Sequence, residues 1–425
     1  MILAVVPASL PDYRAALGAS GAAGPVCASA IGRFPIAMHS LATLLYVREI
    51  DGSYTVAGAV SAALLVGTAA GTVVQGRLLD RLGPSRPLLA LATGYLIAIT
   101  GLIACIEGRV PLAGTLLVGL LAGLLTPAIE GSSRALWSDL VPAGPRREAA
   151  YTYEAISLET FFILGPALAA MLVVATPWPG TALVVAASAE LVGTTWFALS
   201  AAVRRRSARI RAARAAGSLT REAGLLGVFR RPGLRTVALA SLGFGLVAGT
   251  AEVGVLAAAE FAGSPAAGGL LLSAWSVVSV LAGVLYGMRP WPRPLHLRLP
   301  VLLGGFALLV TAMGLVSPLG SLVLLAVIML VAGGLITPQT TAHSLGVELT
   351  APADSATEAF NWMVMAAVLG VSAGQALSGT LIDVLGPGGY AAGGALGLLV
   401  AALLWLRRGT VAAADAAREP AGSLA

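Results

Sequence analysis

The sequence predicts an all-α membrane protein in which twelve transmembrane helices form two pseudo-symmetric six-helix bundles. Composition is the first observation: 57% of the 425 residues are hydrophobic and only 11% are charged, whereas soluble domains carry about 25% charged residues. The second is a series of apolar segments long enough to cross a bilayer, and the third is a basic segment that divides them into two equal sets. Together they exclude a soluble enzyme, a nucleic-acid-binding domain and a disordered chain.

Twelve segments reach the length of about 20 mostly apolar residues that a helix needs to cross a bilayer. In chain order they cover residues 24–47, 54–76, 86–106, 111–136, 152–174, 180–202, 235–258, 266–287, 299–317, 319–343, 357–381 and 388–406. Both cysteines, Cys27 and Cys105, lie in apolar segments and are too few for a zinc site of about four ligands. We therefore expect no metal and no cofactor.

Arginine residues orient the chain. Ten lie between residues 204 and 235, whereas only Arg48 and Arg109 lie in loops of the opposite side. Because basic loops stay in the cytoplasm, we expect a multi-pass protein of the cell membrane with both termini cytoplasmic. The expected parts are a tail (1–23), an N-terminal bundle (24–203), a basic loop (204–234), a C-terminal bundle (235–406) and a second tail (407–425). The basic loop is expected to anchor the topology against anionic lipid, with docking of a partner as the alternative.

The two halves carry traces of an internal repeat. Leu125-Thr126-Pro127 in the fourth span is echoed by Ile336-Thr337-Pro338 in the tenth, at an offset of 211 residues. Each match is short, but the matches occur in the same order in both halves. Transporters are often built from such repeats, with a binding site near the middle of the membrane between them.

The loop after the second span has a distinctive pattern. It contains Gly76, Asp80, Arg81 and Gly83, followed by Arg86. It resembles the signature loop between helices 2 and 3 of the major facilitator superfamily, which reads Gly, three residues, Asp, Arg or Lys, any residue, Gly, then basic residues. Here the first of those basic residues are replaced, and Arg86 comes late. With twelve spans and two halves, the resemblance covers almost the whole chain.

This resemblance implies a two-bundle, major-facilitator-like fold and transport by alternating access. It also implies that Asp80 holds the cytoplasmic gate shut in one state, by pairing with neighbouring helix ends or arginines. A role in topology and folding alone is the alternative.

Two other signatures of the superfamily are incomplete. Gly165-Pro166 in the fifth span matches the start of the antiporter signature, but Ala169-Ala170 stand where two glycines belong. In the fourth span, Thr115 replaces the arginine of proton-coupled drug exporters. The second-half copy of the signature loop, residues 287–293, lacks its acid. These departures argue against ordinary drug–proton antiport.

Several ionisable residues fall inside predicted spans, where charge is costly and requires a partner or water. We expect Arg33, Glu130 and Glu159 to reach similar depths, with Arg134 on the same helix face as Glu130 and Glu154 nearer the surface. The cluster is either a structural salt bridge or a site of proton coupling or substrate contact. Glu159 is our first choice for the coupling carboxylate.

Further candidates lie in the other spans. The expected cavity residues are Glu252, Asn361, Trp275 and Trp362, although ordinary packing is the favoured interpretation of the two tryptophans. Glu190 lies mid-span in the sixth helix, which in the superfamily usually lies outside the cavity. His39 and His343 are candidates for groups that titrate near neutrality. The alternative is that each is a hydrogen-bonded interior residue.

The sequence lacks a Gly-x-x-x-x-Gly-Lys phosphate loop, since it contains no lysine. We therefore expect no enzyme and no direct use of ATP. The predicted function is secondary active transport of a small organic solute, as proton-coupled efflux. Uptake of a metabolite and a non-transporting receptor or scaffold remain alternatives. The expected partners are the solute, protons and the lipid bilayer, with no nucleic acid and a monomeric chain.

Overall fold

The computed structural model describes residues 10–19, 21–51, 54–216, 227–287, 294–352 and 355–416. Within these ranges the regular elements are all helical. The first half contains α1 (Leu10–Leu17), α2 (Ala23–Arg33), η1 (Phe34–Ala37), α3 (His39–Asp51), α4 (Tyr54–Leu82), α5 (Ser85–Glu107), α6 (Leu112–Leu125), α7 (Ile129–Leu140), α8 (Pro145–Ala175), α9 (Thr181–Leu199) and α10 (Ala201–Ala215). The second half contains η2 (Gly227–Arg230), α11 (Pro232–Phe261), α12 (Pro265–Gly287), α13 (Leu295–Val316), η3 (Ser317–Leu319), α14 (Leu322–Gly333), α15 (Ile336–Thr350), α16 (Ala356–Leu385) and α17 (Ala391–Ala416).

The helices account for the predicted spans. Among the described residues, eleven helical segments are long and apolar enough to cross a membrane. A further pair, Ala23–Ala37 and Leu41–Asp51, bends by 43° and makes a twelfth span if it crosses as one. The prediction of an all-α membrane protein is confirmed.

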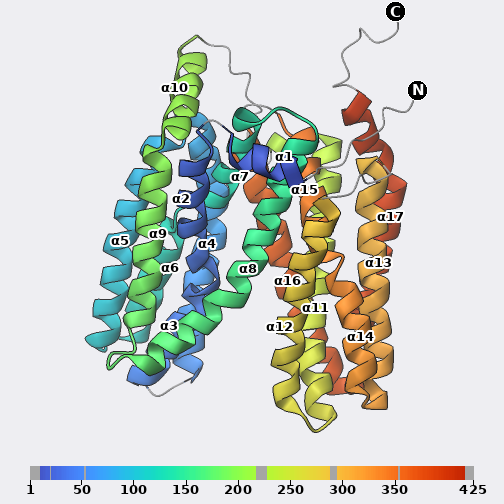
Figure 1. The fold of residues 1–425 in the computed structure, drawn as a ribbon. Helices are drawn as coiled ribbons and strands as arrows, with labels where there is room; N and C mark the ends of the chain where they lie inside the picture. The colour runs from blue at the N-terminus through green and yellow to red at the C-terminus, as the bar shows by residue number, and fades with distance from the viewer. Residues whose placement is uncertain are drawn as a thin grey trace, which may run out of the picture.

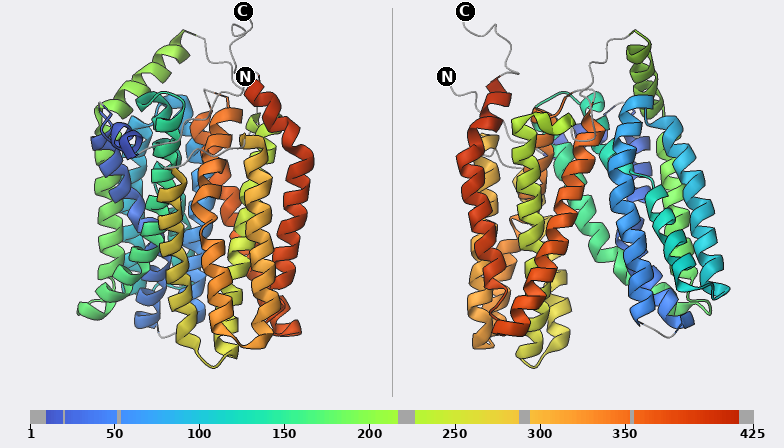
Figure 2. Two further views of the ribbon diagram at one scale, coloured as in Figure 1. Left: turned by 45° about the vertical axis from the view of Figure 1, so that its right-hand side comes forward. Right: turned by 180° about the vertical axis from the view of Figure 1, so that it is seen from behind.

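Two bundles stand side by side, and they are joined unevenly. The helices of the first half form one bundle and those of the second half form the other (Figure 1). At the end where α1, α7, α10 and α15 lie, the bundles meet, and toward the other end they diverge (Figure 2). We call the first the arginine-rich end, because the arginine-bearing ends of α4, α8, α10 and α11 lie there. The start of α1 and the end of α17 also lie at this end.

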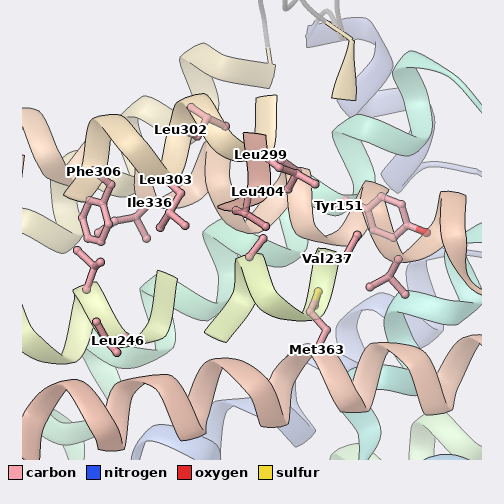
Figure 3. Close-up of a cluster of buried hydrophobic side chains, with 14 of the residues drawn as sticks. Tyr151, Val237, Leu246, Leu299, Leu302, Leu303, Phe306, Ile336, Met363 and Leu404 are labelled. Carbon is pink, nitrogen blue, oxygen red and sulfur yellow. The ribbon is translucent and has the colours of Figure 1, made fainter. Parts of the chain in front are cut away.

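The apolar core shows the same asymmetry. The largest buried cluster fills the C-terminal bundle and continues across the interface into Trp137 and Tyr151 of the N-terminal bundle. Figure 3 shows Tyr151 together with residues of the C-terminal bundle, including Val237 and Met363. A separate cluster around Tyr46 and Tyr95 belongs to the N-terminal bundle alone. Within the described residues, this buried apolar cluster thus joins the bundles at Trp137 and Tyr151, toward the arginine-rich end.

The fourth and tenth spans are broken, although the sequence predicted each as one continuous helix. The breaks separate α6 from α7 and α14 from α15, beside the repeated prolines Pro127 and Pro338. Proline lacks a backbone N–H and disrupts the helical hydrogen-bond ladder. The equivalent placement of the two breaks agrees with the internal repeat.

The side chain of Gln75 on α4 forms hydrogen bonds with the backbone on both sides of the break in the fourth span. Its Nε2 donates to the carbonyl oxygens of Leu124 (2.9 Å) and Thr126 (2.8 Å), and its Oε1 accepts from the N–H of Ala128 (2.8 Å). One amide thus satisfies three backbone groups that a buried helix end would otherwise leave unpaired.

The predicted basic loop is partly a helix. Residues 201–215 form α10, which continues from α9 with one kink at Ser200. Its Arg206 and Arg209 donate to Asp139 at 2.6 and 2.7 Å. The prediction of a loop from residue 204 was wrong over this stretch, because alanines between the arginines favour a helix and Asp139 fixes one face of it. Arg221 lies outside the described residues.

Candidate functional site

Asp80 ends α4 at the interface and contacts the opposite bundle. Its Oδ1 accepts from the backbone N–H of Thr357 (3.2 Å) and its Oδ2 from that of Glu358 (2.7 Å). Both donors lie in the first turn of α16, where unpaired N–H groups and the helix dipole favour a negative charge. Asp80 therefore caps a helix of the other bundle, and this contact holds the two halves together.

Asn361, one turn further along α16, lies in a slot between two glycines of the N-terminal bundle. Its Nδ2 donates to the carbonyl of Thr72 at 2.7 Å. A Cβ at Gly76 would lie 2.6 Å from this nitrogen, and a Cβ at Gly131 would overlap the Asn361 Oδ1. Asn361 was predicted as a cavity residue, but in this structure it is only 1% exposed and belongs to the bundle interface.

The remaining residues of the signature loop organise its turn. Gly83 has φ of +78°, which disfavours residues with a side chain, and a Cβ there would lie 2.6 Å from Ser207 Cα of α10. Arg81 and Arg86 are exposed beside this turn. The second-half copy of the loop, at residues 288–293, lies outside the described part of the chain.

Three ion pairs flank Asp80 and Asn361, and each joins one bundle to the other. They link Arg77 to Glu358 (3.6 Å), Glu148 to Arg298 (2.8 Å), and Arg147 to Glu348. The hydroxyls of Thr152 and Thr341 add a hydrogen bond of 3.4 Å. All of these contacts lie toward the arginine-rich end and join the two bundles there.

Arg33 is buried inside the N-terminal bundle and pairs with Glu154 of α8. The Arg33 Nη1 and the Glu154 Oε2 are 2.5 Å apart, and each side chain is only 1% exposed. The other carboxylate oxygen of Glu154 accepts from Ser133 Oγ and Trp137 Nε1, both at 2.8 Å. Because both charges are paired and hydrogen-bonded, the pair satisfies the conditions for burial.

This geometry corrects the predicted charge cluster. The partner of Arg33 is Glu154, which the sequence placed near the surface, and it is neither Glu130 nor Glu159. Glu130 pairs instead with Arg134, four residues along its own helix, at 3.0 Å. The error arose because depth along a span does not determine which face of the helix a residue occupies.

Glu159 lies on α8, five residues further along the helix than Glu154. It is half-buried, and no ion pair of the described residues includes it. Glu252 on α11 of the other bundle is close enough for the charges to interact. Glu252 accepts a hydrogen bond of 2.9 Å from Gln375 of α16. Two carboxyl groups, one from each bundle, thus lie within electrostatic range of each other.

The candidate tryptophans have packing partners. Trp275 is 5% exposed and stacks on Phe306 with ring centroids 6.0 Å apart. Trp362 makes an edge contact of 5.1 Å with Phe229. Trp275 thus belongs to the interior of the C-terminal bundle, in agreement with the packing alternative.

Gly165 and Pro166 lie on α8 against the break in the first span. A Cβ at Gly165 would lie 2.9 Å from the Ala37 side chain. Pro166 lies inside α8, and the helix continues beyond it to Ala175. The pair therefore permits close approach of α8 to η1.

Sequence reasoning missed several residues of the interface. Gln75, Glu348 and Glu358 were not singled out, and Asn361 was assigned to a cavity. Gln75 directly precedes Gly76 of the signature loop, and Glu358 lies in Thr357-Glu358-Ala359, which resembles Tyr153-Glu154-Ala155 of the first half. The order of the repeat could have indicated Glu358, whereas nothing in the sequence indicated that Gln75 faces a helix break.

Two bundles of apolar helices are thus joined at one end by a helix cap and ion pairs, and they diverge at the other. Among the described residues, no group of three or more His, Cys, Asp or Glu is placed to hold a metal ion. The family model of the Major Facilitator Superfamily matches residues 26–360. The chain belongs to this superfamily, whose fold it shares, and is a secondary transporter.

Solved structures support the fold. A bacterial homologue of the iron transporter ferroportin in an outward-facing state is similar with a TM-score of 0.72 and 16% identity, covering 91% of this chain and 99% of the other. The human organic anion transporter MFSD10 (TETRAN) is similar with a TM-score of 0.63 and 19% identity, and the match covers 89% of this chain and 98% of that protein. The proton:xylose symporter XylE is similar with a TM-score of 0.67 and 13% identity, and the match covers 90% of this chain and 95% of that protein. No curated protein sequence matches the chain.

Proposed function

We propose that the protein exports a small organic solute in exchange for protons by alternating access, with Glu159 as the coupling carboxylate. The observation that carries the proposal is the position of Glu159. It lies within electrostatic range of Glu252 of the other bundle, and no ion pair among the described residues neutralises it. The acidic residues in the contacts between the bundles, Asp80, Glu148, Glu348 and Glu358, each have a cation or a helix end as a partner.

The coupling follows from the cost of burying charge. When the bundles rock so that the divergent end closes, Glu159 and Glu252 move toward each other and lose water. Two carboxylates cannot remain charged at short range in apolar surroundings, so closure requires a proton or a cationic group between them. Opening at the arginine-rich end would then release the proton on that side.

The state of the structure fits the outward-open half of this cycle. The positive-inside rule assigns the arginine-rich end to the cytoplasm, and the bundles meet at that end and diverge at the other (Figure 2). In the proposed cycle, Asp80 and Asn361 form the cytoplasmic gate, which must separate for solute to enter from the cell.

The test is flux in proteoliposomes under an imposed pH gradient, using a panel of small organic solutes. We expect Glu159→Gln to abolish the dependence of flux on the gradient. The matched control is Glu49→Gln, since Glu49 is exposed at the end of α3. Flux that ignores the gradient, or Glu159→Gln with wild-type coupling, refutes the proposal. Net flux in the direction of the proton gradient instead indicates the alternative, uptake by symport.

A further inference from the structure

Three polar residues form a buried cluster inside the N-terminal bundle, away from the interface and from Glu159. The hydroxyl of Tyr95 on α5 lies 2.6 Å from Nε2 of His39 on α3, and the two rings meet edge to face at 5.8 Å. Glu190 on α9 is within electrostatic range of the same hydroxyl. The exposed fractions of His39, Tyr95 and Glu190 are 5%, 0% and 3%. Three helices thus place a hydrogen-bonded imidazole and phenol within electrostatic range of a buried carboxyl group.

The surroundings of the cluster are apolar. Tyr95 belongs to the buried core that includes Met38, Ala42, Ile99 and Ala186. The ion pairs of the described residues leave Glu190 without a cation. An unpaired carboxylate in such a place is so costly that the group neutralises by holding a proton.

Charged groups on the neighbouring helices are engaged elsewhere. The helices packed around His39 and Glu190 are α2, α4, α5, α8, α9 and α10 together with η1. Within the N-terminal bundle, Arg33 pairs with Glu154, Arg206 and Arg209 contact Asp139, Arg146 contacts Asp12, and Glu107 is bonded to Tyr46 and Trp178. Arg77, Asp80, Arg147 and Glu148 contact the C-terminal bundle, and Glu159 lies within electrostatic range of Glu252. The remaining charged groups are exposed: Arg81, Arg86, Arg204, Arg205, Arg211 and Arg214 at the arginine-rich end, and Arg48, Glu49 and Asp51 at the far end of α3. None of the contacts given for the paired groups includes His39 or Glu190.

His39 lies at the bend of the first span. Helix α2 ends at Arg33, η1 covers Phe34–Ala37, and α3 begins at His39 itself. The two parts of the span differ in direction by 43°. The segment before the bend packs closely on α9, where a Cβ at Gly193 would overlap the backbone of Gly32. Because α2 is fixed in this way, any change at the bend moves α3.

The position of His39 links charge to this bend. At the first residue of a helix the imidazole lies at the positive end of the helix dipole, where a cation is disfavoured. In a continuous span, the same residue would lie in the middle of a helix, away from the partial positive charge at a helix N-terminus. Protonation of His39 therefore favours a straighter span, and the neutral imidazole favours the bent one.

We propose that His39, Tyr95 and Glu190 form a proton-binding site inside the N-terminal bundle, and that the protonation of His39 controls the bend of the first span. With one proton on Glu190 the site is neutral, and this is the state that fits the bent span. A second proton, taken from water and bound by His39, straightens it. The site is separate from Glu159, and the proposal does not depend on which solute is carried.

The first measurement concerns Glu190. Infrared spectroscopy of the purified protein in lipid at neutral pH should show a carboxylic acid carbonyl band that Glu190→Gln removes. Glu260→Gln, at an exposed residue near the end of α11, is the control and should leave the band in place. If Glu190→Gln leaves the carboxylic acid region unchanged, Glu190 is ionised and the proposal fails.

The second measurement concerns the bend. Spin labels on the native, exposed Cys27 of α2 and on Glu49→Cys of α3, in a Cys105→Ala background, report the distance across it. Because apolar surroundings disfavour the imidazolium form of His39, we expect the distance to increase between pH 7.5 and pH 3.5. His39→Gln should abolish the change, whereas His343→Gln, the buried histidine of the other bundle, should retain it. A distance independent of pH, or a change that survives His39→Gln, overturns the proposal.

Two further variants keep the test decisive. If His39→Gln does not fold, Tyr95→Phe removes the hydroxyl but keeps the ring, and it should displace the pH at which the distance changes. An unaltered midpoint contradicts the role of the cluster. Glu159→Gln should leave both readouts unchanged, so failure of this proposal and failure of the proposed function are distinguishable.

Discussion

Replacing Asp80 with asparagine tests how the two bundles are held together at the arginine-rich end. In the wild type, both carboxylate oxygens accept from backbone N–H groups of α16, at 3.2 and 2.7 Å. Hydrogen bonds to a charged group contribute about 1.5–3 kcal/mol each, and a charge at a helix N-terminus contributes about 0.3–1 kcal/mol more. Asparagine keeps one neutral acceptor, and its amide nitrogen cannot accept the second bond. We expect a loss of about 2 kcal/mol, or roughly 30-fold in the ratio of closed to open states.

The assay is a distance measurement between the bundles. Spin labels at Ala143, between α7 and α8, and at Arg230 of η2 are exposed on opposite sides of the interface at this end. Asp80→Asn should add a population with a longer distance. Asp383→Asn, at an exposed acid near the other end of α16, should not. If Asp80→Asn gives the wild-type distance distribution and wild-type flux, the cap does not stabilise the closed end.

Two further predictions concern packing and buried charge. Gly131→Ala places a methyl group on the Asn361 side chain, so we expect a longer distance between the same labels, whereas Gly58→Ala, where a Cβ meets nothing within 4 Å, should have no effect. Equal distances in both variants would show that the slot is not needed. Arg33→Met leaves Glu154 buried without its cation and should destabilise the protein by about 3–5 kcal/mol, measured by thermal unfolding. The double variant Arg33→Met with Glu154→Leu should regain most of that loss; an additive loss would mean that the pair is not coupled.

The sequence by itself determined the number of membrane spans, the division into two halves and the family. The reason lies in the bilayer. Its thickness fixes the length of each span, and its apolar interior makes charged residues rare within spans, so the loops between them are easily recognised. The signature loop was also readable, because its glycines and its acid have fixed spacing along one turn.

Tertiary structure alone decided which charged residues meet. Glu154 and Glu159 differ by five residues, and at 3.6 residues per turn they point about 140° apart around α8. Depth in the membrane could not show that the first faces Arg33 and the second faces the other bundle. That choice depends on how α8 is rotated against its neighbours, and packing across several helices sets the rotation.

The same holds for contacts between the bundles. Asn361 and Gly131 are more than 200 residues apart in sequence, and they meet only because α16 and α7 cross at the arginine-rich end. The bend beside His39 depends likewise on the close approach of α2 to α9. Local preferences fix the helices, whereas the distances that give them a function arise only when separate helices pack together.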